Sequence, residues 1–211
     1  MTRFYIIRHG NTVANQENRL AGHYETPLTD LGREQAKMAG NALRDIEADC
    51  AYSSDLTRAY ETACIATDNK IFIEKRAELR EMYCGEWEGV LAEELDQKYP
   101  AERAIWHNAF GKCWPTGGES AVQLYNRVSS ALKELARLNP DKNVLIFSHG
   151  AAIHCMANWA DGIKAEDMKK EGIPANASVT VIEVKDGVPT LIKKGDVSHL
   201  GSKATALPKN I

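Results

Sequence analysis

Phe4-Tyr5-Ile6-Ile7-Arg8-His9-Gly10-Asn11-Thr12 is a hydrophobic run that ends in a cation, an imidazole and a glycine. The pattern returns late in the chain as Val144-Leu145-Ile146-Phe147-Ser148-His149-Gly150. Each short apolar run is typical of a buried strand. Because ligands of open α/β sheets bind outside the carboxyl ends of the strands, we expect His9 and His149 to face one crevice. Two histidines there, with Arg8 beside one of them, predict chemistry on an anion, although either histidine alone is equally well explained as the cap of a strand.

The rest of the chain alternates between helical and strand patterns. This alternation predicts βαβ units, a mainly parallel sheet and an α/β fold. Further short strands are expected over 50–53 and 71–73. The runs 178–184 and 190–192 flank Lys185-Asp186-Gly187, which predicts a hairpin with Asp-Gly at its turn.

Helix boundaries can also be predicted from local signals. Thr29 is expected to cap a helix whose apolar residues recur at helical spacing, and Asp55 is expected to cap the helix that carries Arg58. A long amphipathic helix is expected after Gly118, and Pro140 should end it.

Length and composition limit the class of protein. A chain of 211 residues has the size of one domain, and we expect that domain over 1–200 with a polar, poorly ordered tail over 201–211. Hydrophobic residues make up 44% and charged residues 26%, as in soluble globular proteins. The net charge is −3 without a basic run, so neither nucleic acid nor an anionic membrane is an expected partner.

The cysteines indicate a reducing compartment. There are five, an odd number, and none forms a C-x-x-C pair. This argues against a disulfide framework and against a zinc knuckle. We expect no signal peptide and no membrane span, because the first strand begins near residue 4 and no apolar stretch is long enough. A cytoplasmic enzyme is therefore expected.

Several motifs follow the first one along the chain. They are Gly22, Pro27-Leu28-Thr29, Ser53-Ser54-Asp55-Leu56-Thr57-Arg58-Ala59, Glu81 with Gly85 and Trp87-Glu88-Gly89, Gly118-Glu119-Ser120, and Ser148-His149-Gly150. With Arg8-His9-Gly10-Asn11-Thr12 and Asn15, this series resembles the histidine phosphatase superfamily, which includes the cofactor-dependent phosphoglycerate mutases. The resemblance covers roughly residues 4 to 160, and the chain looks most like the phosphatase branch of the phosphoglycerate mutase-like family.

The resemblance implies a mainly parallel three-layer α/β/α sandwich of the phosphoglycerate mutase-like type, with a small helical lid insertion. The insertion corresponds to 90–117, where two short helical patterns are broken at Pro100. Its aromatic and histidine residues are Tyr99, Trp106, His107, Phe110 and Trp114. A lid that sets substrate preference and a helical pair that merely covers a sheet edge both remain open at this point.

Phosphoryl transfer requires an in-line nucleophile, positive charge at the phosphate oxygens and a proton for the leaving group. The resemblance assigns the phosphohistidine to His9, and a neutral imidazole is a competent nucleophile. The Gly10 carbonyl is expected to bind the other ring nitrogen and so fix the tautomer. Arg8 and Arg58 are expected to bind the phosphate, because a planar guanidinium can donate two parallel hydrogen bonds to two phosphate oxygens. For Arg58 the alternative is an ordinary surface arginine in the first turn of a helix.

Two further residues complete the expected catalytic set. His149 is expected to donate to a phosphate oxygen. Glu81 is the proposed general acid, which then acts as base on the water that hydrolyses the phosphohistidine. Its place before the motif over 84–89 singles it out, and Glu86 and Glu88 are its competitors.

Other residues are assigned to the surroundings of the phosphate. The expected phosphate or substrate contacts are Gly10, Thr12, Asn15, Gly22, His23, Gly150 and Ala151. Asn15 matches a polar contact of the family, with an exposed helix position as the alternative. His23 occupies the loop position where the mutases usually have tryptophan. No metal and no other cofactor is expected, because the histidines lack two-His-plus-carboxylate spacing and the arginines oppose a cation.

Departures from the mutases favour hydrolysis. The segment between Glu81 and His149 is shorter than in the mutases, and its basic residues match no mutase pattern. We therefore expect a phosphatase that hydrolyses a small phosphomonoester, so that a small-molecule phosphate ester is the partner. A primer-dependent phosphoglycerate mutase is the alternative, followed by a non-catalytic module that binds phosphorylated ligands. The identity of the ester and a homo-oligomeric state stay open.

Overall fold

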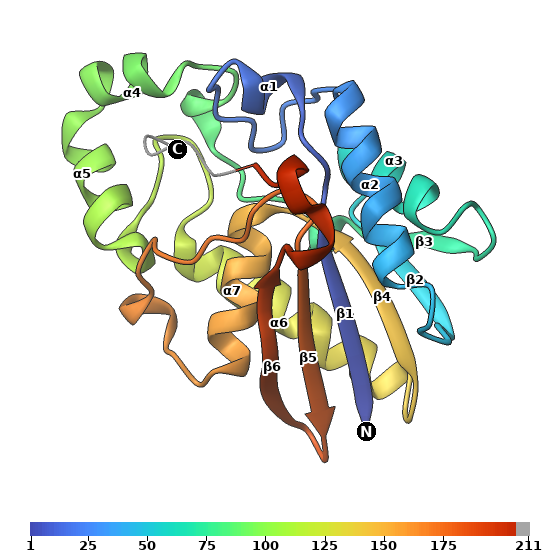
Figure 1. The fold of residues 1–211 in the computed structure, drawn as a ribbon. Helices are drawn as coiled ribbons and strands as arrows, with labels where there is room; N and C mark the ends of the chain where they lie inside the picture. The colour runs from blue at the N-terminus through green and yellow to red at the C-terminus, as the bar shows by residue number, and fades with distance from the viewer. Residues whose placement is uncertain (206–211) are drawn as a thin grey trace.

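A computed structural model describes residues 1–205 of the chain and contains one six-stranded sheet in the order β3-β2-β4-β1-β5-β6 (Figure 1). The strands are β1 Thr2–Arg8, β2 Cys50–Ser53, β3 Ile73–Lys75, β4 Asn143–Ser148, β5 Val179–Lys185 and β6 Val188–Asp196. The pairs β1–β4, β2–β4 and β2–β3 are parallel, whereas β1–β5 and β5–β6 are antiparallel. The sheet is thus mixed but mainly parallel, as predicted.

Helices surround this sheet on both faces (Figure 1). The α-helices are α1 Val13–Gln16, α2 Asp30–Ala42, α3 Thr57–Ala66, α4 Ala92–Lys98, α5 Pro100–Asn108, α6 Ala121–Leu138 and α7 Gly150–Ala160. The 3₁₀-helices are η1 Ala77–Leu79, η2 Gly85–Trp87, η3 Phe110–Lys112, η4 Ala165–Asp167 and η5 Ser198–Lys203. Together they form the predicted three-layer α/β/α sandwich.

The two faces of β1 explain the three layers. Successive side chains of a strand point to opposite faces. Phe4 and Ile6 are fully buried in a core shared with α6 and α7, whereas Ile7 is buried in a second core with α2 and α3. A run that is apolar on both faces therefore requires helices on both sides.

Local signals set several helix ends as expected. The Thr29 side chain accepts a hydrogen bond from the Gly32 amide and so caps α2. Ser120 and Gln123 form a reciprocal capping box at the start of α6, which ends at Leu138 before Pro140. At the turn of the β5–β6 hairpin, Asp186 has φ +52° and Gly187 has φ +78°, and the Asp-Gly pair tolerates this left-handed backbone.

Two local predictions were wrong. Asp55 does not cap α3: the N-cap residue is Leu56, and the Asp55 carboxylate pairs instead with the Arg80 guanidinium at 2.6 and 2.7 Å. The third predicted strand lies two residues later than expected, at Ile73–Lys75. Phe72 explains the shift, because its side chain is 84% exposed and offers the sheet nothing to pack against.

The segment 90–117 forms the two helices α4 and α5, which lie at the same end of the molecule as α1 (Figure 1). Pro100 is the first residue of α5, where its missing amide hydrogen costs no bond. Near the other terminus, η5 extends to Lys203, whose carbonyl accepts a hydrogen bond from Gln35 at 2.8 Å. Residues 201–205 of the expected tail are therefore bound to α2, and 206–211 lie outside the described residues.

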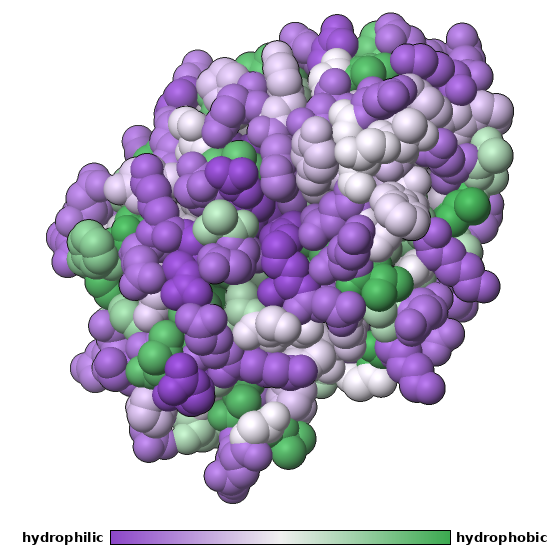
Figure 2. All heavy atoms as spheres, turned by 180° about the vertical axis from the view of Figure 1, so that it is seen from behind, coloured by the Kyte–Doolittle hydropathy of each residue, from purple (hydrophilic) through white to green (hydrophobic). Residues whose placement is uncertain are grey.

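The surface of the face seen in Figure 2 is mainly hydrophilic, with hydrophobic residues scattered among polar ones. Within residues 1–205, no helix combines the length and the apolar character needed to cross a membrane.

Candidate active site

The two strand-histidine units meet at the carboxyl ends of adjacent parallel strands. Arg8 ends β1 opposite Ser148 at the end of β4. The next amide, that of His9, donates to the Ser148 carbonyl at 3.0 Å. The ring centroids of His9 and His149 lie 5.2 Å apart. The two histidines therefore lie side by side, and His9 lines the cavity described below, whereas His149 is fully buried behind it.

His9 is held in one tautomer. Its ring is buried, and Nδ1 lies 2.7 Å from the Gly10 carbonyl oxygen. A carbonyl only accepts hydrogen bonds, so Nδ1 carries the proton and Nε2 keeps a free lone pair. Burial, followed by the charges of Arg58 and Arg8, holds the pKa of His9 well below its usual range. The imidazole is therefore neutral at pH 7 and able to act as a nucleophile.

The backbone next to His9 is tightly packed. A side chain at Gly10 would come within 2.3 Å of the Gly32 carbonyl oxygen in α2, so only glycine permits this approach. The Asn176 amide donates to the His9 carbonyl at 3.1 Å and to the Asn15 side chain at 3.1 Å. The sequence analysis missed Asn176, and no local pattern around it signals this contact.

Arg8 and Arg58 are both almost fully buried, at 5% and 1% exposure. Arg8 Nη1 donates to the Pro174 carbonyl at 2.7 Å, and Arg58 donates to the carbonyls of Gly22 at 2.6 Å and Tyr24 at 3.1 Å. These bonds fix the direction of each guanidinium. Burial lowers the pKa of Arg8 to about 10, and burial also lowers that of Arg58, so both remain cations at neutral pH. Arg58 is not the surface arginine of the alternative interpretation.

His149 is also fixed by its neighbours. Its Nε2 lies 2.8 Å from the Ser54 hydroxyl, which in turn accepts from the Leu56 amide at 3.3 Å. Ser54 is fully buried, and His149 Nε2 is the acceptor within its reach in the described structure. The hydroxyl therefore donates to Nε2, which leaves the ring proton on Nδ1. Burial, with the charge of Arg58, holds the pKa of His149 well below its usual range.

The Glu81 carboxylate lies at the N-terminus of α7. One oxygen accepts from the amides of Met82 at 2.9 Å and Ala152 at 3.1 Å, and the other from the amide of Ala151 at 3.1 Å. These amides fix the position of the Glu81 carboxyl group beside the cavity. Gly150 and Ala151 line the cavity beside the carboxylate.

Arg127 holds the backbone that carries Glu81. Its guanidinium donates to the carbonyls of Glu78 at 2.9 Å, Arg80 at 3.0 Å and Glu81 at 3.0 Å. Glu119 pairs with the same guanidinium at 2.7 and 2.9 Å. The sequence analysis gave Arg127 no function, although Glu119 belonged to a recognised motif.

Thr12 and Asn15 lie where the sequence analysis expected phosphate contacts. They form the capping box of α1 and both line the cavity. Gly22 lines the cavity as well. His23 is set back from it: its Nε2 lies 2.8 Å from the Glu81 carbonyl, and its ring packs against Tyr83.

The other candidate side chains have partners elsewhere. Glu86 accepts from the Tyr99 hydroxyl at 2.6 Å, and Glu88 accepts from the amides of His23 and Cys84. The His154 ring lies on α7 with Nε2 2.6 Å from the Lys169 carbonyl. Neither glutamate lines the cavity that Glu81 lines.

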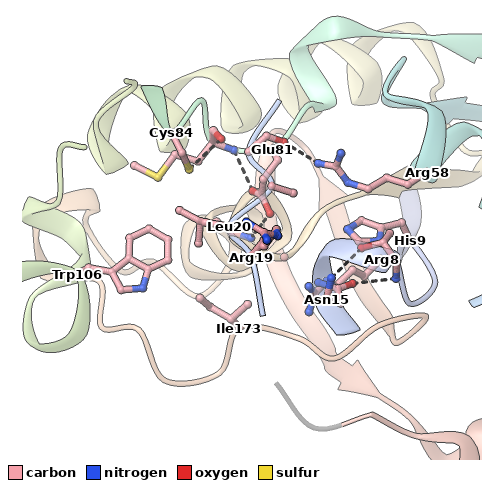
Figure 3. Close-up of a pocket in the computed structure, with 16 residues that line it drawn as sticks. Arg8, His9, Asn15, Arg19, Leu20, Arg58, Glu81, Cys84, Trp106 and Ile173 are labelled. Carbon is pink, nitrogen blue, oxygen red and sulfur yellow. Dashed lines mark hydrogen bonds between the residues drawn. The ribbon is translucent and has the colours of Figure 1, made fainter. Parts of the chain in front are cut away.

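The cavity between these residues has two different ends (Figure 3). Arg8, His9, Asn15 and Arg58 lie at one end. Leu20, Cys84 and Trp106 lie at the other end (Figure 3), and Arg19, Ala21, Met82 and Ile173 also line the cavity. Glu81 lies between the two ends (Figure 3). The cavity volume is about 60 Å³.

The segment 90–117 contributes one side chain to this cavity within the described chain, Trp106 of α5. Its indole packs edge-to-face on Trp87 and Phe110, with ring centroids 5.9 and 5.1 Å apart. Trp114, by contrast, is 63% exposed. Most of the aromatic residues of this segment therefore stabilise the helical pair or face solvent.

Comparisons with known proteins agree with this geometry. The chain is 34% identical over 200 residues to phosphoglycerate mutase-like protein 4 of Arabidopsis thaliana, with coverage of 92% of this chain and 85% of that one. It is 30% identical over 202 residues to phosphoserine phosphatase 1 of Hydrogenobacter thermophilus, with 95% of each chain covered. The solved structure of Bacillus stearothermophilus YhfR superposes with a TM-score of 0.90 at 31% identity, over 95% of this chain and all of that one.

The model of the histidine phosphatase superfamily, branch 1, matches residues 4–197. This match covers both strand-histidine units, the intervening loops and the segment 90–117. The chain therefore belongs to the histidine phosphatase superfamily and is an enzyme of its phosphoglycerate mutase-like type.

Proposed function

We propose that this protein is a phosphatase that hydrolyses a small phosphomonoester through a phosphohistidine on His9. One observation carries the proposal: in residues 1–205, Arg8 Nε, Arg58 Nε and His149 Nδ1 are buried nitrogens without a hydrogen-bond partner. All three belong to side chains around the His9 ring. A buried donor left unpaired costs about 1–3 kcal/mol, so such a cluster favours a ligand that carries several acceptor oxygens. A phosphate group meets this requirement.

In the first step, His9 Nε2 attacks the phosphorus atom in line with the ester oxygen. A bond forms between Nε2 and phosphorus while the bond between phosphorus and the ester oxygen breaks. Arg8, Arg58 and His149 Nδ1 stabilise the charge on the equatorial oxygens. Protonated Glu81 gives its proton to the departing alkoxide, which leaves as the alcohol.

In the second step, water replaces the alcohol. The Glu81 carboxylate takes a proton from water as the oxygen attacks phosphorus, and the bond to His9 Nε2 breaks. Phosphate leaves, Glu81 is protonated again, and His9 returns to its neutral form. Thr12, Asn15, Gly22 and the Gly10 backbone complete the proposed phosphate end.

Glu86 and Glu88 are bound elsewhere, which leaves Glu81 as the glutamate that lines the cavity and supports its role as the acid. The short segment between Glu81 and His149 favours water over a sugar acid as the acceptor. The names of the relatives include both a mutase-like protein and a phosphatase. The five cysteines of the chain are all unpaired, which supports a reducing, cytoplasmic location.

Phosphate release by metal-free protein tests this proposal. The panel contains phosphate monoesters and 3-phosphoglycerate, the latter with and without a bisphosphoglycerate primer. We expect phosphate release without primer. We also expect transfer of ³²P from a labelled ester to the wild-type protein but not to the His9→Ala variant. Isomerisation that depends on primer, with no net release, would make the protein a mutase. Tight ester binding without any turnover would make it a binding module.

A further inference from the structure

We infer that Asn176, in the loop before β5, is a positioning residue that fixes the directions of His9 and Asn15. This inference rests on the proposed phosphatase function and adds a residue to which the mechanism above gives no role. The Asn176 side chain is buried, and it is not among the described residues that line the cavity. It therefore acts through its neighbours and not on the ester itself.

The side-chain amide of Asn176 has three acceptors within reach. Its Nδ2 lies 3.1 Å from the His9 carbonyl oxygen, 3.3 Å from the Gly10 carbonyl oxygen and 3.1 Å from Asn15 Oδ1. Because Nδ2 carries two hydrogens, one of them is shared between two acceptors. A single buried group thus holds the backbone of the proposed nucleophile and the side chain of a proposed phosphate contact.

The bond to Gly10 bears on the tautomer of His9. The Gly10 carbonyl oxygen binds His9 Nδ1 at 2.7 Å, and Asn176 donates to the same oxygen. Asn176 therefore helps to fix the position of the acceptor that keeps the ring proton on Nδ1. A displaced carbonyl would allow the proton to move to Nε2, and Nε2 would then lose the lone pair that attacks phosphorus.

The bond to Asn15 decides which end of that side chain is free for the phosphate. Asn15 Oδ1 accepts from Asn176 Nδ2 at 3.1 Å and from the Thr12 amide at 3.2 Å. Asn15 lines the cavity at the end where His9 lies (Figure 3). Since Oδ1 is used by these two donors, Nδ2 of Asn15 is left to donate to a phosphate oxygen.

The backbone of the loop before β5 supports the same role. Ala177 has φ +54°, a left-handed conformation that is unfavourable for a residue with a side chain. The Ala177 amide donates to the His9 carbonyl at 3.2 Å, and the Pro174 carbonyl accepts from Arg8 at 2.7 Å. Such a conformation persists where the surrounding contacts over-determine it. The loop is thus tied to two neighbouring residues of the site by its backbone as well.

Asn176→Ala tests the inference on the full-length, metal-free protein. We expect single-turnover transfer of ³²P from a labelled ester to His9 to be about 10–100-fold slower, because a shift of about 1 Å in a reacting group has a cost of this order. The loss should be the same for alkyl and nitrophenyl phosphates, since the attack and not the protonation of the leaving group is affected. Long-range ¹H–¹⁵N spectra should show His9 protonated at Nδ1 in the wild type and partly at Nε2 in the variant.

Asn139→Ala is the matched control. Asn176 and Asn139 are both 4% exposed, and Asn139 Nδ2 donates to the Tyr52 hydroxyl at 3.1 Å and the Leu135 carbonyl at 3.0 Å. The Asn139 carbonyl accepts from Thr2 at the start of β1, so this residue lies at the other end of the strand from His9. We expect Asn139→Ala to lose thermal stability while the transfer rate and the His9 tautomer stay as in the wild type.

Asn176→Leu is the second variant, because leucine has the same branched shape and leaves no space where alanine does. It should show the same slow transfer and the same change of tautomer. An unchanged rate and tautomer in either folded variant would overturn the inference, as would an equal loss of rate in Asn139→Ala. Absence of a phosphohistidine in the wild-type protein would instead overturn the proposed function.

Discussion

The two ends of the cavity are built in different ways. At the phosphate end, Arg8, His9 and His149 follow the carboxyl ends of two paired strands, and Arg58 begins the helix after a third. Each of these side chains has a partner that fixes its direction. At the other end, Leu20 and Cys84 come from loops and Trp106 from α5, and all three side chains belong to one hydrophobic core. Directed hydrogen bonds thus orient the side chains at one end of the cavity, and packing in the core orients those at the other.

Removal of the nucleophile gives the largest expected effect at the phosphate end. His9→Ala should lower kcat about 10⁴-fold or more on every ester, because no other side chain is aligned for attack. The measurement is phosphate release, with thermal unfolding to establish that the variant folds. Lys70→Ala is the control, since its exposed side chain pairs with Asp68 away from the cavity. Full activity in His9→Ala would remove His9 as the nucleophile.

Glu81 lies between the two ends of the cavity (Figure 3), so the loss of activity on replacing it should depend on the leaving group. Glu81→Gln is expected to slow alkyl phosphates about 10²–10⁴-fold, and nitrophenyl phosphate much less, because nitrophenolate leaves without protonation. Glu88→Gln serves as the control carboxylate, because it binds backbone amides outside the cavity. An equal loss on both kinds of ester in Glu81→Gln would contradict its role as acid.

Replacement of Arg127 tests whether hydrogen bonds outside the cavity position the Glu81 carboxyl group. Arg127→Met should lower kcat on alkyl phosphates about tenfold to a hundredfold, with a smaller loss on nitrophenyl phosphate, because a shift of about 1 Å in Glu81 has that cost. Arg76→Met, which removes surface ion pairs with Glu78 and Glu134, is the matched control. A purely structural role for Arg127 would lower both rates equally.

Ser54 sharpens the description of the phosphate end. Ser54→Ala removes the donor that keeps the proton of His149 on Nδ1, and one hydrogen bond corresponds to a loss of up to about tenfold in kcat. Long-range ¹H–¹⁵N spectra report the tautomer directly, and wild-type His149 should be protonated at Nδ1. Ser53→Ala is the neighbouring control, since within the described residues that hydroxyl donates to the Ser54 carbonyl. Protonation of His149 at Nε2 in the wild type would refute the assignment.

The smallest expected effect is on the pH dependence of the free energy of unfolding. His9 and His149 are neutral when folded because their pKa values are depressed, whereas the unfolded chain takes up protons near pH 6.5. The free energy of unfolding is therefore highest above about pH 6.5 and falls as the pH is lowered, by up to about 1.4 kcal/mol per pH unit for each histidine. Urea unfolding at pH 7.0 and 5.5 measures the slope, which should be shallower in His9→Gln. Equal slopes would mean that His9 is not neutral by burial.

Local patterns were sufficient for much of the fold. The β1 and β4 runs, the Thr29 cap and the Asp-Gly hairpin are each specified by a few neighbouring residues. The prediction failed at Asp55, because a long-range ion pair with Arg80 outcompetes the cap that the local sequence favours. It also misplaced the third strand, where burial of Ile73 rather than Phe72 sets the register.

The sequence by itself determined that two histidines and an arginine follow buried strands, because strand patterns are local and parallel strands end at one edge of a sheet. Only the tertiary structure decided which partners orient them. Ser54 and His149 are 95 positions apart, Arg127 and Glu81 are 46 apart, and Asn176 and His9 are 167 apart. Such pairs form only after the helices pack, since side-chain directions across the sheet follow from layer geometry and not from neighbouring residues. The same packing brings Leu20, Trp106 and Ile173 into the lining of one cavity.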